Sequence, residues 1–134
     1  MKTSKNFWGV TLIAAAATLL MPGSASAQSG ITRTNLQRHD LSISGHEAIQ
    51  ILVNFEKGDA FGMHSHPGEE VIYVLEGSFE YQIEGSQPVK LNAGDVLFIP
   101  AGANHSAKNI GKGKAIELAT YIVEKGKPLL KLKK

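Results

Sequence analysis

Short segments in which apolar and polar residues alternate run through most of this chain. The clearest are His46–Phe55 and Ser78–Glu84, where large apolar side chains recur at every second position. A period of two places these side chains on one face of a β-strand, and the β-branched residues of the first segment favour a strand over a helix. The same reading predicts further strands at Gly62–His66, Glu70–Leu75, Val89–Leu91, Val96–Ile99 and Ala115–Val123.

Glycine, proline and asparagine residues separate these segments at intervals of about 8–12 residues, which is typical of an all-β sandwich or barrel. Glu70–Leu75 is almost continuously apolar, as expected of a strand covered on both faces. Residues 108–114 are predicted to form a glycine-rich loop. No segment after residue 27 has a convincing helical pattern. Closure of the sheet would remove the exposed edges of such a small β protein.

The first 27 residues have the pattern of a secretory signal peptide. Lys2 and Lys5 precede the uncharged apolar run Phe7–Met21, and an Ala-Ser-Ala sequence ends at Ala27. The apolar run is shorter than the roughly 20 residues that a membrane-spanning helix needs. We therefore expect cleavage after Ala27, a periplasmic or secreted protein, and no stable membrane anchor after cleavage.

Composition limits what the remaining chain can be. Residues 28–134 are enough for one domain, predicted as an N-terminal arm or edge strand (28–45), a β-barrel (46–123) and a lysine-rich C-terminal tail (124–134). Without Lys2 and Lys5, twelve of the 14 basic residues remain and balance the 12 acidic ones. Nucleic-acid binding, which needs a clustered basic face, is not expected. The chain has no cysteine, so stability must come from the core, a bound metal or a partner subunit.

A set of four residues has the chemistry of a metal site. His64 and His66 point to the same face of a strand, whereas on a helix they would lie about 200° apart. Together with His105 and a glutamate they provide three imidazoles and one carboxylate, ligands that suit divalent Fe, Mn, Ni, Co, Cu or Zn. Strand alternation alone leaves two registers open, one presenting Glu70 and the other Glu69.

Two glycine-punctuated segments resemble the motifs of the cupin superfamily. Their residues, in order, are Gly58, His64, His66, Glu70 and Gly77, and then Gly94, Pro100, Gly102, His105 and Asn109. The resemblance extends from about Ile49 to Val123. It implies an antiparallel jelly-roll barrel (a double-stranded β-helix) of six to eight strands that often dimerises through its sheets. It also implies the metal ligands His64, His66, Glu70 and His105, because the spacing to Gly77 selects Glu70 over Glu69. Asn109 is expected to fix the loop after His105.

The function expected from this resemblance is that of a small exported metalloenzyme acting on a small organic molecule, as a homodimer. With four protein ligands, a six-coordinate ion keeps two open positions. These suit dioxygenase chemistry, or Lewis-acid chemistry in an isomerase, lyase or decarboxylase. The Lewis-acid route needs a group that transfers a proton, and the candidates are Glu69, Tyr73, Tyr81, His46 and Glu117. None of them is convincing, and this favours the dioxygenase. A non-catalytic cupin that binds a small ligand is the competing hypothesis.

Overall fold

The computed structural model describes residues 30–134, so the expected signal peptide lies outside the described residues. Within this part of the chain every regular element is a strand, and none forms a helix long and apolar enough to cross a membrane. The strands are β1 (Thr32–Asp40), β2 (His46–Phe55), β3 (Ala60–Ser65), β4 (Gly68–Glu76), β5 (Ser78–Ile83), β6 (Val89–Asn92), β7 (Val96–Ile99), β8 (His105–Asn109), β9 (Ala115–Glu124) and β10 (Lys131–Leu132).

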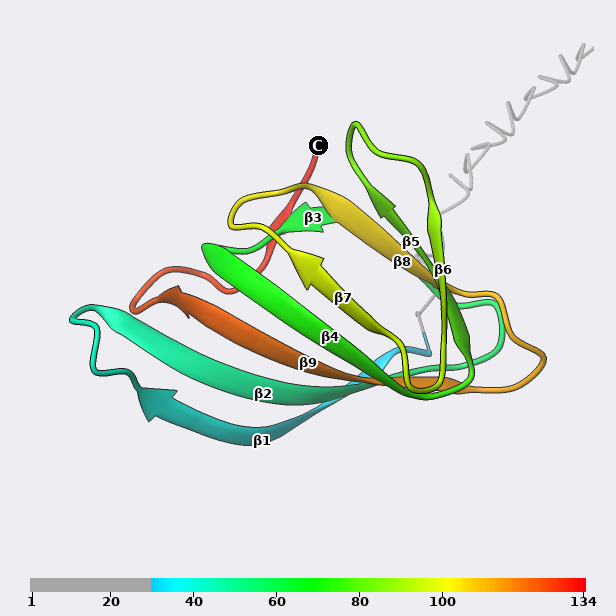
Figure 1. The fold of residues 1–134 in the computed structure, drawn as a ribbon, viewed down its shortest axis with the longest axis horizontal. Helices are drawn as coiled ribbons and strands as arrows, with labels where there is room; N and C mark the ends of the chain where they lie inside the picture. The colour runs from blue at the N-terminus through cyan, green and yellow to red at the C-terminus, as the bar shows by residue number, and fades with distance from the viewer. Residues whose placement is uncertain (1–29) are drawn as a thin grey trace, which may run out of the picture.

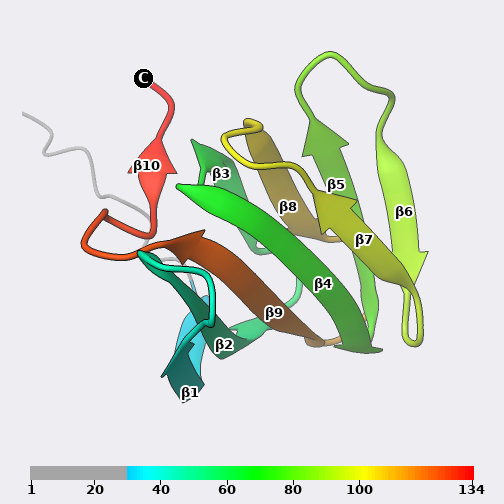
Figure 2. The ribbon, with the colours of Figure 1, turned by 60° about the vertical axis from the view of Figure 1, so that its left-hand side comes forward.

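The ten strands form two five-stranded antiparallel sheets that face one another (Figures 1 and 2). One sheet, called sheet A, has the order β1-β2-β9-β4-β7, and the other, sheet B, has the order β10-β3-β8-β5-β6. The predicted all-β fold is confirmed, with more strands than the six to eight expected. The two additional strands at the sheet edges, β1 and β10, come from the predicted arm and the predicted tail.

The core lies between the sheets and is built from the inward positions of alternating strands. In β2 and β9, every second side chain is buried, as the period of two predicts. Phe55 from sheet A and Phe79 from sheet B meet edge to face, with ring centroids 5.1 Å apart. Such aromatic pairs add about 0.5–1.5 kcal/mol beyond the burial of their area. The core therefore fixes the spacing of the two sheets near the predicted metal residues.

The prediction that Glu70–Leu75 is covered on both faces is wrong for the isolated chain. Glu70, Ile72 and Val74 face the core, but the alternate residues of β4 face outward and are exposed. Two more exposed apolar side chains lie beside them on β7. The outer face of sheet A thus carries an apolar patch, which we call the β4–β7 patch; its residues and exposed fractions are Val71 (37%), Tyr73 (44%), Leu75 (46%), Val96 (65%) and Phe98 (57%).

Residues 108–114 were predicted as a loop, but their first part belongs to β8. His105, Ala107 and Asn109 are the buried residues of this strand, and none of them is a large apolar residue. Asn109 is 1% exposed, and its side-chain amide donates to the carbonyl oxygens of Phe55, Glu56 and Gly113. Its side-chain oxygen accepts from the backbone N–H of Gly111. The expected role of Asn109 in fixing the following loop is confirmed.

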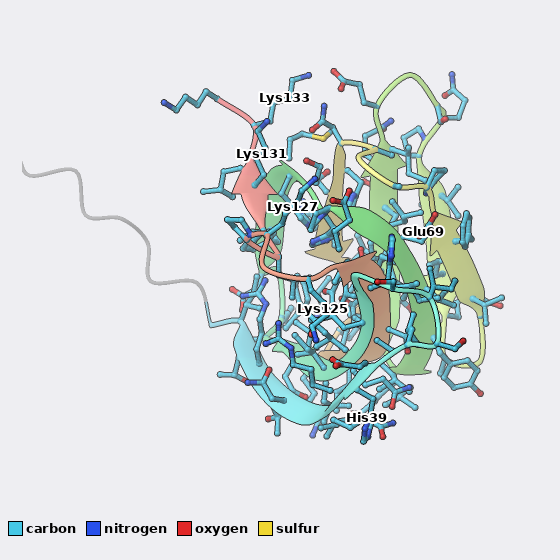
Figure 3. The ribbon with its side chains drawn as sticks, turned by 90° about the vertical axis from the view of Figure 1, so that its left-hand side faces the viewer. His39, Glu69, Lys125, Lys127, Lys131 and Lys133 are labelled. Atoms are coloured by element: carbon cyan, nitrogen blue, oxygen red, sulfur yellow. The ribbon has the colours of Figure 1, made fainter. Side chains whose placement is uncertain are left out.

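The lysine-rich end of the chain is an ordered segment rather than a free tail. It runs antiparallel beside β3 at the edge of sheet B, where Lys131 pairs with Ser65 and Leu132 pairs with His64 (Figure 2). Figure 3 shows four of its lysines along this side of the molecule. Three of those lysines form ion pairs: Lys125 with Asp40, Lys127 with Glu124, and Lys133 with Glu84. Most of this positive charge is therefore matched locally. We call residues 126–134 the C-terminal strap.

Candidate metal centre

Three strands bring the predicted ligands together at one end of the core. His64 lies on β3, His66 directly follows it, Glu70 lies on β4 and His105 begins β8. All four are buried, with exposed fractions of 6%, 6%, 3% and 1% respectively. The three histidines offer ligand atoms that lie within 4.8 Å of one another. The Glu70 carboxylate reaches them, with Oε2 at 3.0 Å from His105 Nε2 and 3.3 Å from His66 Nε2.

Each histidine ring is fixed by a backbone carbonyl group. The Nδ1 atom of His64 lies 2.8 Å from Gly62 O, that of His66 lies 2.6 Å from Leu129 O, and that of His105 lies 3.0 Å from Ala103 O. A carbonyl oxygen only accepts hydrogen bonds, so each Nδ1 carries the proton and donates it. In the neutral ring Nε2 is then left with a lone pair, as in metal-binding histidines of known proteins.

The arrangement fits a bound cation. His66 Nε2 and Glu70 Oε2 are buried and have no hydrogen-bond partner among the described residues. Lone pairs of imidazole and carboxylate that face one another at about 3 Å repel unless a proton or a cation lies between them. A buried polar group without a partner costs about 1–3 kcal/mol. A divalent ion held by the three Nε2 atoms and Glu70 would satisfy both atoms.

The charge states suit the same interpretation. Burial lowers the pKa of His64 to about 4, and the neighbouring His105 and His66 add to this effect, so the ring is neutral at pH 7. Burial alone would raise the pKa of Glu70, but a proton on Nε2 of His105 or His66 beside it outweighs burial and lowers that pKa to about 2, and a cation among these residues would act in the same direction. Glu70 is therefore the ionised member of the group, and the site is prepared for a cation without further loss of protons from these two residues.

A small cavity of about 20 Å³, room for about one water molecule, opens beside these residues. Two buried side chains on its wall, Tyr81 from sheet B and Glu117 from sheet A, are hydrogen-bonded to each other, with the Tyr81 hydroxyl donating. Burial raises the pKa of Glu117 to about 8 and raises that of Tyr81 well above its ordinary value. At pH 7 Glu117 is thus mostly protonated, in the range expected of a proton-transferring group.

The other predicted candidates lie elsewhere. Glu69 and Tyr73 alternate with Glu70 on β4, so they face outward, and Figure 3 shows Glu69 on the surface. His46 begins β2, where its Nδ1 lies 3.0 Å from Ser44 O. Of the five candidates for proton transfer, the structure brings only Tyr81 and Glu117 to the cavity.

Three contributors to the site were not predicted. Arg33 of β1 lines the cavity, as does Tyr121 of β9, whose ring packs against His66 with centroids 4.7 Å apart. Leu129 contributes only its carbonyl oxygen, from the C-terminal strap. Strand alternation could have predicted that Tyr121 faces the cavity, because it shares the inward face of β9 with Glu117. Position in the sequence offered no signal for Arg33 or for a backbone atom of the strap.

Two glycines allow the backbone to follow its path around the site. Gly77, between β4 and β5, has φ = +77°, and a Cβ there would lie 2.7 Å from the carbonyl oxygen of Lys114. Gly102, with φ = +72°, turns the chain just before His105. Residues with a Cβ rarely adopt such angles, so both positions favour glycine. The Gly102 N–H also donates a hydrogen bond to the carbonyl oxygen of His66, at 3.2 Å.

Comparison with known families and structures agrees with this architecture. Residues 51–127 match the family described as the cupin domain. A conserved protein with a double-stranded β-helix domain from Klebsiella pneumoniae superimposes with a TM-score of 0.65 at 20% identity, covering 81% of this chain and 88% of that one. The predicted double-stranded β-helix is therefore confirmed.

Two curated relatives match shorter regions. An oxalate-binding protein from Thermotoga maritima is 37% identical over 67 residues, which are 49% of this chain and 54% of that protein. The dimethylsulfoniopropionate lyase DddQ of Ruegeria pomeroyi is 35% identical over 57 residues, which are 42% of this chain and 28% of the lyase. The matched part thus spans about half or less of the length of these relatives.

Proposed function

The chain belongs to the cupin superfamily, and from this premise we propose that it is an exported, metal-dependent lyase or decarboxylase acting on a small carboxylate. The observation that carries the proposal is the Tyr81–Glu117 pair, which lines the same cavity as His64, Glu70 and His105. The lack of a convincing proton-transferring group was the reason to favour a dioxygenase. A buried carboxyl with a pKa of about 8 in the cavity removes that reason.

The proposed metal would be held by His64, His66, Glu70 and His105. When bound, a divalent ion supplies Lewis-acid polarisation of a substrate carboxylate or carbonyl oxygen. The protein supplies the proton: in a decarboxylation, the bond between the carboxylate and its neighbouring carbon breaks, carbon dioxide leaves, and the electron pair stays on that carbon. Glu117 is mostly protonated at pH 7 and can deliver its proton there, directly or through the Tyr81 hydroxyl.

Cavity size and the relatives support a small substrate. At about 20 Å³ the cavity is far smaller than ordinary ligand pockets, so only a very small ligand fits without movement of its walls. One relative is an oxalate-binding protein and the other is a lyase. Oxalate is therefore the first compound to test, and decarboxylation would convert it to formate and carbon dioxide.

The test begins with anaerobic purification and metal analysis, followed by assays of carbon dioxide release and oxygen consumption with oxalate and other small carboxylates. We expect release of carbon dioxide with no net oxygen consumption, and loss of most of this activity in Glu117→Gln with metal content retained. Stoichiometric iron with substrate-dependent oxygen consumption would instead establish the dioxygenase. Tight ligand binding without turnover by the metal-loaded protein would establish the non-catalytic binding function.

Two further properties form part of the proposal. Export is supported by the pattern of residues 1–27, and the exported protein is expected to begin at Gln28, which mass spectrometry of the mature chain will check. A homodimer is supported by the β4–β7 patch, since soluble monomers rarely leave such a contiguous apolar surface exposed. A second copy that covers this face would also bury the outer side of β4.

A further inference from the structure

Arg33 is placed differently from the other arginine on the same strand. Arg38 is bound by both oxygens of buried Glu47, with N–O distances of 2.6 Å and 2.5 Å. Arg33 pairs with Val53 in the β1–β2 register, and its guanidinium lies over the ring of Phe61, 4.6 Å from the centroid. Among residues 30–134 it forms no ion pair with a carboxylate. Its hydrogen-bond donors are thus not committed to an acidic side chain.

The guanidinium lies at the entrance of the metal cavity. Arg33 is itself exposed, yet it lines the cavity together with His64, Glu70 and Glu117. Phe61, beneath it, packs edge-on against His64 with ring centroids 4.6 Å apart. Arg33 therefore connects the solvent-exposed edge strand of sheet A to the ligand-bearing strand of sheet B. Burial raises the pKa of Glu117 to about 8, and the positive charge of Arg33 opposes that rise.

The placement of the groups around the cavity indicates what Arg33 would bind. The three histidines and Glu70 are buried at its inner end, and the Arg33 guanidinium lies at its exposed end. A divalent ion held by the buried residues and the guanidinium would place one positive group at each end. A ligand with two carboxylates can meet both groups, and the planar fork of arginine is suited to hold a carboxylate through two hydrogen bonds.

We propose that Arg33 binds one carboxylate of a small dicarboxylate at the cavity entrance while the rest of the ligand faces the three histidines and Glu70. Arg33 would then select dicarboxylates over monocarboxylates of similar size. This inference rests on the proposed function for the metal, but it requires only binding and no turnover. It assigns a role in ligand recognition to the N-terminal strand, which lies outside the segment that carries the metal-binding motifs.

The test compares equilibrium binding of oxalate, malonate and succinate with that of acetate and of oxamate, the monoamide of oxalate, by calorimetry on the metal-loaded protein. We expect Arg33→Gln to weaken the preferred dicarboxylate about tenfold or more, and to change acetate and oxamate affinity by less than about twofold. Metal content and the thermal unfolding midpoint should not change. Arg33→Lys, which keeps the charge but loses the fork, should fall between the two.

Lys57→Gln is the matched control, because it removes one positive charge from the exposed turn between β2 and β3. It should leave all affinities unchanged. The inference is overturned if no dicarboxylate binds to the metal-loaded wild-type protein, if Arg33→Gln has no effect, or if it weakens mono- and dicarboxylates equally or lowers the metal content. The proposed function fails separately, through the absence of carbon dioxide release, so the two failures can be told apart.

Discussion

At the scale of single residues, Glu70 is the one ionised group that faces the three imidazoles. Its neighbour Glu69 points out of the opposite face of β4, which makes a matched pair of positions for a test. We expect Glu70→Gln to lower the affinity for a divalent metal by about 100-fold, because the charge that offsets the ion is lost while the shape is kept. Glu69→Gln should bind metal as the wild type does, measured by equilibrium dialysis with elemental analysis. Metal retained in Glu70→Gln and lost in Glu69→Gln would assign the ligand to Glu69.

A second prediction at this scale concerns pH and Glu117. The pKa of this carboxyl is raised from 4.5 to about 8 on folding, chiefly by burial, so between these values the folded state binds more protons than the unfolded state. The stability present at low pH is therefore lost as pH rises toward about 8. We expect the free energy of unfolding of the metal-free protein to fall by about 1–2 kcal/mol between pH 6.5 and 8, and then to level off.

The matched variant for this prediction is Glu117→Gln, which should remove the decline when unfolding by urea is measured at each pH. His64 does not interfere in this window, since its pKa lies at about 4 when folded and near 6.5 when unfolded. Its own contribution has the opposite sign and is lost as pH falls below about 6.5. An identical slope in the wild type and in Glu117→Gln above pH 6.5 would contradict the assignment of Glu117 as a buried, protonated group.

At the scale of elements, the C-terminal strap acts on the metal site from outside the motif segments. Leu129 O accepts the Nδ1–H of His66, and Leu132 pairs with His64 on β3. Partners that orient a metal-binding histidine in this way typically contribute 10–100-fold to metal affinity. We expect a chain ending at Pro128 to bind metal about tenfold more weakly or worse. A chain ending at Leu132 keeps both contacts and serves as the control, with circular dichroism to show that both chains fold. Equal metal affinity for the two truncated chains would show that the strap does not support the site.

Only some of the strands could be predicted from the pattern of apolar residues in the sequence. Strands such as β2 and β9 bury apolar side chains at every second position, so their pattern was sufficient to predict them. The inward residues of β8 are His105, Ala107 and Asn109, which are polar or small and give no hydrophobic period. β1 is exposed at every position, and β10 forms only through pairing with β3. These strands depend on partners far away in the sequence, which a local pattern does not report.

The metal residues were predictable for a different reason from the rest of the site. Their side chains carry recognisable chemistry at fixed spacings, and the period of two on β4 reduced the choice of glutamate to two positions. Arg33 and the carbonyl of Leu129 reach the site through tertiary packing alone. The pKa of Glu117 is a property of burial, so the sequence offered the residue as a candidate but gave no reason to prefer it. The residues that bind the metal could thus be identified from the local sequence. The groups that orient them and the group that transfers a proton could not.

At the scale of the whole molecule, the proposed homodimer depends on the outer face of sheet A. Within the β4–β7 patch, Val71 is paired with Phe98 and Tyr73 with Val96 across the two strands, so the apolar side chains form one continuous surface. This surface extends toward β9 through Leu118, which is paired with Tyr73 and is only half-buried. A two-fold arrangement would place the same surface of two subunits against each other. Burial of these side chains would then stabilise the dimer at about 25 cal/mol per Å² of apolar area, less the cost of association.

We expect the wild-type protein to sediment as a dimer at micromolar concentration, and the double variant Val96→Lys/Phe98→Lys to sediment as a monomer. Val96 and Phe98 are 65% and 57% exposed in the single subunit, so lysine at these positions should change the stability of the subunit itself by only about 0.5 kcal/mol. Two positive charges at the centre of an apolar interface would be costly to bury. Val89→Lys, on β6 of the other sheet, is the control and should remain dimeric. A monomeric wild type would contradict the dimer, and a dimer that survives the double variant would place the interface on another face.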